Sequence, residues 1–266
     1  MKKYFLIAIF FLVSLSAFAQ NFDSLISKTE KEQFLSQKNE ILMLLFDGIE
    51  ISNKHDLEEV KWKPNFYESK QNVISDEDFA YTHLDTVFFY QEGNIKKAVV
   101  IFATYMYEKN RAIDCHFCAP TISVATFEYD EKLKKWQVNK FDKFYGTHGL
   151  YGKIQTIVLK KIGKEKIALF FYAGFTHMGE NYSCTTIYDL SKFEKLKTVK
   201  THYENLGSHP ESEKEKWIKT SKEIIFDTTQ INSNGYYDLI ITTINKNSTK
   251  VEVFEYRNLE GYVLKE

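Results

Sequence analysis

The chain has 266 residues, a formal net charge of −1, 16% aromatic residues and only three prolines. A nearly neutral chain lacks the basic surface that nucleic-acid binding requires, so no nucleic-acid partner is expected. The length suits one large domain with a helical extension, and the aromatic-rich, proline-poor composition favours strands over disorder.

The N-terminus has the pattern of a cleaved secretory signal. Lys2 and Lys3 precede an apolar run over residues 4–13, and the stretch ends in Ala17-Phe18-Ala19. This predicts a signal peptide over residues 1–19, cleavage before Gln20, and export to the periplasm or the extracellular space. The run is shorter than the ~20 residues that a spanning helix needs, so we expect no membrane span in the mature chain.

Residues 20–79 are expected to form a helical segment followed by a linker. Apolar residues recur at helical spacing between positions 34 and 49: Phe34, Leu35, Ile41, Leu42, Leu45, Phe46 and Ile49. This spacing predicts one amphipathic helix whose apolar stripe packs on the rest of the protein. Residues 61–78 show no period and are expected to form a loop that connects the helix to the β region.

Residues 80–266 are predicted to be a β-repeat domain of three similar units. Each unit has four short apolar or alternating runs separated by turn residues, and Gly93, Gly163 and Gly235 mark the first turn of each. The predicted strands are 86–90, 96–105, 123–130 and 136–138, then 154–159, 167–174, 184–190 and 196–199, then 223–226, 236–243, 250–256 and 262–264. We therefore predict a mainly β fold of three four-stranded antiparallel meanders. Since three blades are too few for a closed propeller, the arrangement is expected to be open or incomplete, with the helix covering its edge. The alternative is a β-sandwich or barrel built from the same strands.

One loop of the third unit, residues 230–238, resembles the calcium loop of FG-GAP/VCBS-type β-propeller repeats. Asn232, Asn234, Gly235 and Asp238 fit motif positions three, five, six and nine, whereas Gln230 stands where Asp is usual. The resemblance implies a propeller-like blade, with Asn232, Asn234 and Asp238 as calcium candidates. A single motif carboxylate is little charge for calcium, so a plain Asn-Gly hairpin turn is the favoured interpretation.

The meander plan places the long loops on one face. These loops hold Cys115, His116, Cys118, His148, His177, His202 and His209, with Cys184 at the start of the next strand. Because binding residues tend to collect on long loops, Cys115, His116, Cys118, His148 and His177 form the candidate binding face. His148 and His177 are expected to lie near the Cys115–Cys118 loop and opposite the Asn232–Asp238 turn.

The three cysteines admit several interpretations. A disulfide suits an exported chain, and the three pairings among Cys115, Cys118 and Cys184 stay open, although Cys115–Cys118 closes the shortest loop. A zinc site would combine the Cys115–Cys118 pair with two ligands from His116, His148, His177 or Cys184. A disulfide is favoured over a metal, and both over catalysis.

The sequence favours a binding function over an enzymatic one. It contains no G-x-S-x-G, no H-E-x-x-H and no phosphate-binding glycine loop. We expect an exported, non-catalytic β-repeat module that binds a protein, a glycan or a small ligand through its long-loop face. The alternative is a metal- or thiol-dependent protein or enzyme with a Cys/His site on that face.

Overall fold

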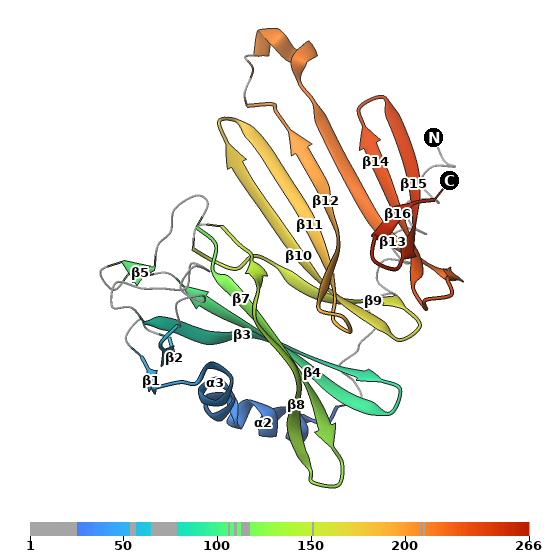
Figure 1. The fold of residues 1–266 in the computed structure, drawn as a ribbon. Helices are drawn as coiled ribbons and strands as arrows, with labels where there is room; N and C mark the ends of the chain where they lie inside the picture. Colours follow the sequence, from blue (N-terminus) through green and yellow to red (C-terminus); the bar gives the residue numbers. More distant parts are fainter. Residues whose placement is uncertain are drawn as a thin grey trace.

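The protein consists mainly of two antiparallel β-sheets, with two short helices on one of them (Figure 1). The computed structural model describes residues 26–53, 57–64, 79–105, 107–108, 111–112, 118–150, 152–207, 209 and 211–265. The predicted signal peptide therefore lies outside the described residues. None of the helices in the described part of the chain is both long enough and apolar enough to cross a membrane.

The first sheet has six strands in the order β1-β2-β3-β4-β7-β8. They are β1 (Glu50–Ser52), β2 (Glu59–Trp62), β3 (Ala80–Glu92), β4 (Ile95–Tyr105), β7 (Thr121–Asp130) and β8 (Lys135–Thr147). A separate two-stranded ribbon joins β5 (Tyr107–Glu108) to β6 (Arg111–Ala112). The first predicted unit corresponds to β3, β4, β7 and β8.

The second sheet is a meander of eight strands, in which every strand pairs with its neighbours in sequence. They are β9 (Ile157–Gly163), β10 (Lys166–His177), β11 (Glu180–Asp189), β12 (Glu194–Glu204), β13 (Lys219–Ile231), β14 (Tyr237–Asn245), β15 (Ser248–Arg257) and β16 (Gly261–Leu264). A short 3-10 helix, η2 (Glu211–Lys216), lies between β12 and β13.

The prediction of a mainly β, antiparallel fold is confirmed. The strands of the second and third predicted units belong to a single sheet, because β12 pairs with β13 through His202–Ser221, Tyr203–Thr220 and Glu204–Lys219. Propeller blades are separate sheets, whereas here the twelve strands predicted for the three units fall into two sheets. Within the described residues neither sheet closes into a barrel.

Two helices, α2 (Lys28–Ser36) and α3 (Lys38–Phe46), occupy the stretch predicted as one helix. The chain turns at Gln37, whose φ of −94° and ψ of 5° are not helical. The Ser36 hydroxyl donates to the Gln33 carbonyl at 2.8 Å. Such side-chain bonds to the backbone of the preceding turn compete with a regular helix, which accounts for the break at this place.

Both helices pack on a face of the first sheet and not on an edge, so the predicted edge-covering role is wrong. Phe34 of α2 is fully buried, with its ring edge-to-face against Phe89, Phe127 and Trp136 at centroid distances of 5.6, 5.0 and 5.4 Å. The sheet is instead extended by β2 and β1, from a segment predicted as helix end and linker.

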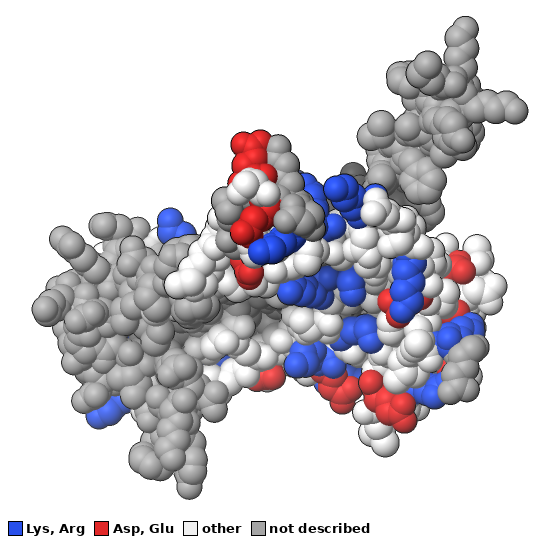
Figure 2. Space-filling model, turned by 90° about the horizontal axis from the view of Figure 1, so that it is seen from above, with Lys and Arg blue, Asp and Glu red and all other residues white. Residues whose placement is uncertain are grey.

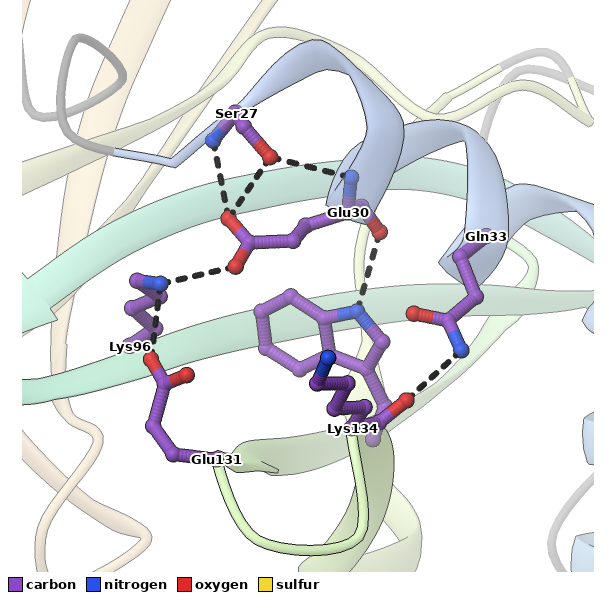
Figure 3. Close-up of polar contacts among 7 residues, drawn as sticks. Ser27, Glu30, Gln33, Lys96, Glu131 and Lys134 are labelled. Carbon is purple, nitrogen blue, oxygen red and sulfur yellow. Dashed lines mark hydrogen bonds and ion pairs between the residues drawn. The ribbon is translucent and has the colours of Figure 1, made fainter.

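Polar contacts fix the start of α2 against β4 and β8 (Figure 3). The Ser27 hydroxyl accepts from Glu30 N–H, and the Glu30 carboxylate accepts from Ser27 N–H at 2.9 Å, which forms a capping box. The same carboxylate pairs with Lys96 at 2.7 Å, and the Glu30 carbonyl accepts from the Trp136 indole at 3.0 Å. The first helical turn is thereby tied to two strands.

The apolar runs of β4 and β10 are buried on both faces because each strand lies between two cores. On β4, Ala98, Val100 and Phe102 face the helices, and Val99 and Ile101 face the second sheet. On β10, Leu169 and Phe171 meet the first sheet, while Ala168 and Phe170 face a third core inside the bent second sheet. Strict alternation of side chains along a strand lets one continuous apolar run serve two cores.

Candidate functional site

The structure places the loop that holds His148 beside the segment that holds Cys118. The His148 N–H donates to the Pro120 carbonyl at 3.3 Å, and the Gly152 N–H donates to the Cys118 carbonyl at 2.7 Å. The loop after β8 is therefore fastened to the segment that leads into β7. Cys115 and His116, the other members of this predicted cluster, lie outside the described residues.

The His148 ring is packed against β10. It meets the Phe171 ring edge-to-face at 4.7 Å between centroids and donates a hydrogen bond to the Tyr172 carbonyl. Burial lowers the pKa of His148 to about 4, against the weaker opposing effect of that hydrogen bond. Its Nε2 is buried and has no hydrogen-bond partner within the described part of the chain. At neutral pH the ring is uncharged and keeps one unused acceptor.

His177 lies elsewhere. It ends β10 at the exposed hairpin formed with β11, six residues along the strand from Phe171, or about 20 Å at the rise of a β-strand. His202, on β12, lies 3.5 Å from Glu204, and His209 lies 3.6 Å from Glu213. The structure thus places His148, but not His177, beside the Cys118 segment.

Cys118 and Cys184 are in different chemical states and are not joined to each other. Cys118 is disulfide-bonded, whereas Cys184 is a free, half-buried thiol on β11. Burial raises the pKa of the Cys184 thiol, which keeps it protonated and weakly nucleophilic.

A groove of about 410 Å³ lies next to this region, and we call it the strand-end groove. Its lining comes from the segment before β9 and from β10, β11 and β12: Ile154, Gln155, Thr156, Tyr172, Ala173, Gly174, Ser183, Cys184 and Thr201. No lining residue carries a charge at neutral pH, and hydroxyl, amide and main-chain groups dominate. Of the residues singled out from the sequence, only Cys184 lines it.

The groove borders an incompletely paired edge of β10. β9 pairs with β10 only as far as Phe171, after which Tyr172 N–H donates to the Thr156 carbonyl at 2.9 Å. At Gly174 a side chain replaces the neighbouring strand. The Gln155 amide accepts from Gly174 N–H at 2.6 Å and donates to its carbonyl at 3.0 Å. Gln155 therefore ends the pairing on this side of β10 among the described residues.

The residues that resemble a calcium loop form a hairpin turn. The Asn232 side-chain oxygen accepts from the N–H groups of Asn234 and Tyr236, both at 3.0 Å, and Gly235 has a φ of +81°. Asn234 accepts from the Asn258 amide at 3.2 Å, and Asp238 pairs with Lys265 at 2.8 Å. The oxygens that calcium would need already accept hydrogen bonds from N–H groups and an ammonium.

No metal-binding cluster of three or more His, Cys, Asp or Glu side chains occurs in the part of the chain that the structure describes. On the face seen in Figure 2, patches of Lys and Arg alternate with patches of Asp and Glu over the described surface. Charges of both signs on one face do not make the single-sign surface that a nucleic acid needs.

Comparisons of the chain with protein-family models, with curated proteins and with solved structures found no match.

Proposed function

We propose that the protein is an exported, non-catalytic interaction module that binds an extended polypeptide segment along the incomplete edge of β10, beside the strand-end groove. The observation that carries this proposal is that pairing on the β9 side of β10 ends at the Gln155 side chain, so that Thr176 beyond it faces no described strand on that side. An edge strand with unpaired main-chain groups is a template for a further strand, and adding one is a recurring mode of peptide recognition.

The N–H groups of successive residues along β10 point alternately to its two sides, which identifies Thr176 as the residue whose N–H a bound peptide would pair with first. Tyr172 and Gly174 direct their N–H groups toward the β9 side, so Thr176, two residues further on, directs its own to the same side. No described residue pairs with this side of β10 beyond Gly174. Side chains of the bound segment would enter the uncharged groove, which suits apolar and neutral polar residues.

A proline substitution tests the proposal. Peptides would be selected on the mature chain from a displayed library of random linear sequences. Thr176→Pro removes the edge-facing N–H but leaves the main-chain pairing with β11 in place, so binding should weaken about tenfold or more. Thr176→Val keeps the N–H and is the matched control. The bond from the Thr176 hydroxyl to the Asn181 side chain of β11 is lost equally in both variants.

Equal binding of the selected peptides to both variants would contradict the proposal. So would a library that yields no binder while a glycan panel does. A second readout is alkylation of Cys184, the free thiol of the groove, which a bound peptide should slow.

The remaining expectations are proposals on the sequence evidence. Export rests on the residue 1–19 pattern, and exported material should begin at Gln20. The pairing Cys115–Cys118 and the descent of the three strand groups from FG-GAP-like repeats are proposed on the same basis. In support of the repeat plan, Gly93 and Gly235 both adopt positive φ at equivalent first turns, whereas Gly163, at the first turn of the second unit, does not.

The alternative function is a metal centre with His148 as one ligand. It is favoured by the buried, unpartnered Nε2 of a ring that is neutral at physiological pH, as metal ligation requires. Zinc that copurifies with the wild-type protein and is lost in His148→Gln would support this alternative over peptide binding.

A further inference from the structure

A second cavity lies between the two sheets, away from the strand-end groove. Its volume is about 260 Å³. The first sheet contributes residues of β3, β4, β7 and β8. The second sheet contributes one residue of β10 and residues of the β9–β10 and β11–β12 turns. We call it the inter-sheet cavity. It lies at the end of the apolar interface where the β9–β10 turn approaches β4 (Figure 1).

The floor of this cavity combines hydroxyls with apolar side chains. Tyr90 and Thr126 are each only 4% exposed, and Ile167 and Leu190 are buried beside them. The Thr126 Oγ1 has no hydrogen-bond partner among the residues that the structure describes. Burial raises the pKa of Tyr90, and Glu92 and Glu128 raise it further, so its hydroxyl stays a donor. Buried polar groups are normally paired, so an unpaired hydroxyl on a cavity floor points to a guest that pairs with it.

The charges of the cavity cancel. Glu92 and Glu165 carry two negative charges, and Lys97 and Lys140 carry two positive ones. Lys97 is already paired with Glu92 and, at 3.1 Å, with Glu128, while Lys140 donates to the Ser191 carbonyl. Lys140 and Glu165 lie at the exposed mouth, where screening by water makes single charges weak determinants of affinity.

We propose that the inter-sheet cavity binds a small, uncharged, polyhydroxylated molecule of monosaccharide size. A hydroxyl of such a guest both donates and accepts, so it can pair with Thr126 and Tyr90 together. Its carbon skeleton packs on Ile167 and Leu190. The remaining hydroxyls meet Lys140 and Glu165 at the mouth, one a hydrogen-bond donor and the other an acceptor. The site, its ligand and its residues are separate from those of the peptide-binding proposal.

The experiment is a titration of the mature protein with a panel of neutral monosaccharides and alditols, followed by calorimetry and by chemical-shift changes. Thr126→Val removes the floor hydroxyl at nearly constant volume, and it should weaken binding of the active panel member about tenfold or more. The matched control is Thr185→Val. Thr185 is buried too, and its hydroxyl likewise has no partner among the described residues, but it lies outside the cavity lining.

Three outcomes would overturn the proposal. The first is equal affinity of both variants, and the second is a panel without any binder, which would mean that the cavity is filled by water only. The third is tighter binding of a carboxylate, an amine or an amino acid than of any neutral sugar. Thr176→Pro should leave sugar binding unchanged, so failure of the peptide proposal and failure of this one are distinguishable.

Discussion

At the scale of single residues, burial decides how the histidines behave. His148 is packed on Phe171, and its pKa falls to about 4 because the charged form would lose its water. His83 stacks on Tyr105 with ring centroids 5.0 Å apart, and burial lowers its pKa as well. Both rings are therefore held neutral by the fold.

The lowered pKa of His148 predicts that the folded protein loses stability in mild acid. The folded pKa of about 4 lies below the ordinary 6.5, so between these pH values the unfolded chain binds a proton that the folded chain does not. Stability must then fall as the pH drops from 6.5 toward 4. His148→Gln should flatten the plot of urea midpoint against pH over this window, and His83 should maintain part of the slope.

The control is Leu44→Ala on α3, which changes no titratable group and whose side chain is 71% exposed. It should leave the plot parallel to that of the wild type. Parallel plots for His148→Gln and the wild type would show that His148 is not responsible.

Little of the candidate site could be predicted from residue types. Cys184 and His148 could be selected as site candidates from the sequence, because cysteine and histidine are rare and reactive. Gln155, Ser183 and Thr201 were not, because a hydroxyl or amide in an alternating strand has the same pattern whether it lines a groove or faces water. His177 was grouped with His148 because equivalent loops fall on one side of a meander, but a long strand separates them along the face.

At the scale of elements, Phe34 is the main attachment of α2. Its ring touches three aromatic rings of the first sheet and is wholly buried. Phe34→Ala should lower the free energy of unfolding by about 3–5 kcal/mol, because the cavity lies between elements that relax only partly. Urea unfolding followed by fluorescence measures it.

The control is Leu44→Ala on α3, where the side chain is 71% exposed. Its effect should stay within about 0.5 kcal/mol. Similar losses for both variants would mean that packing of Phe34 on the sheet is not the source of its contribution, because alanine has the higher helix propensity in both cases.

The strands of residues 80–266 were predictable because apolar runs and turn residues alternate regularly along the chain. β1 and β2 were not, because Glu50–Ser52 and Glu59–Trp62 are short and contain charged residues. They become strands only through pairing with each other and with β3. The break between α2 and α3 was hidden for a related reason, since the apolar spacing continues across Gln37 while a side-chain bond from Ser36 interrupts the backbone.

At the scale of the whole molecule, a short strand ladder decides that two predicted units form one sheet. Within the described residues, the ladder between β12 and β13 has three residue pairs, and hydrogen bonds between Asn205 and Ile218 continue it. Strand patterns cannot reveal such a short ladder, which is why separate blades and a continuous sheet look alike in sequence. The continuous apolar runs of β4 and β10 did indicate that these strands lie between two packed layers, because a strand without polar alternation is buried on both faces.

The shared core between the sheets predicts that they unfold together. Leu169 of β10 is fully buried in this core with Val99 and Ile101 of β4. Trp62 and Trp136, in the helix-covered core of the first sheet, report on that sheet once Trp217 is replaced by Phe. In this background Leu169→Ala changes only the second sheet. It should nevertheless lower the free energy of unfolding measured by tryptophan fluorescence by about 2–5 kcal/mol.

The transition should also coincide with loss of β-structure by circular dichroism, as a two-state unit requires. Val251→Ala, at a side chain of β15 that is 59% exposed, is the control and should move neither signal. If Leu169→Ala shifts the dichroism signal and leaves the tryptophan transition in place, the sheets unfold separately. In that case the inter-sheet core only docks two independent domains, and the inter-sheet cavity would open without unfolding either of them. A single shifted transition means that any ligand held between the sheets stabilises the entire described fold.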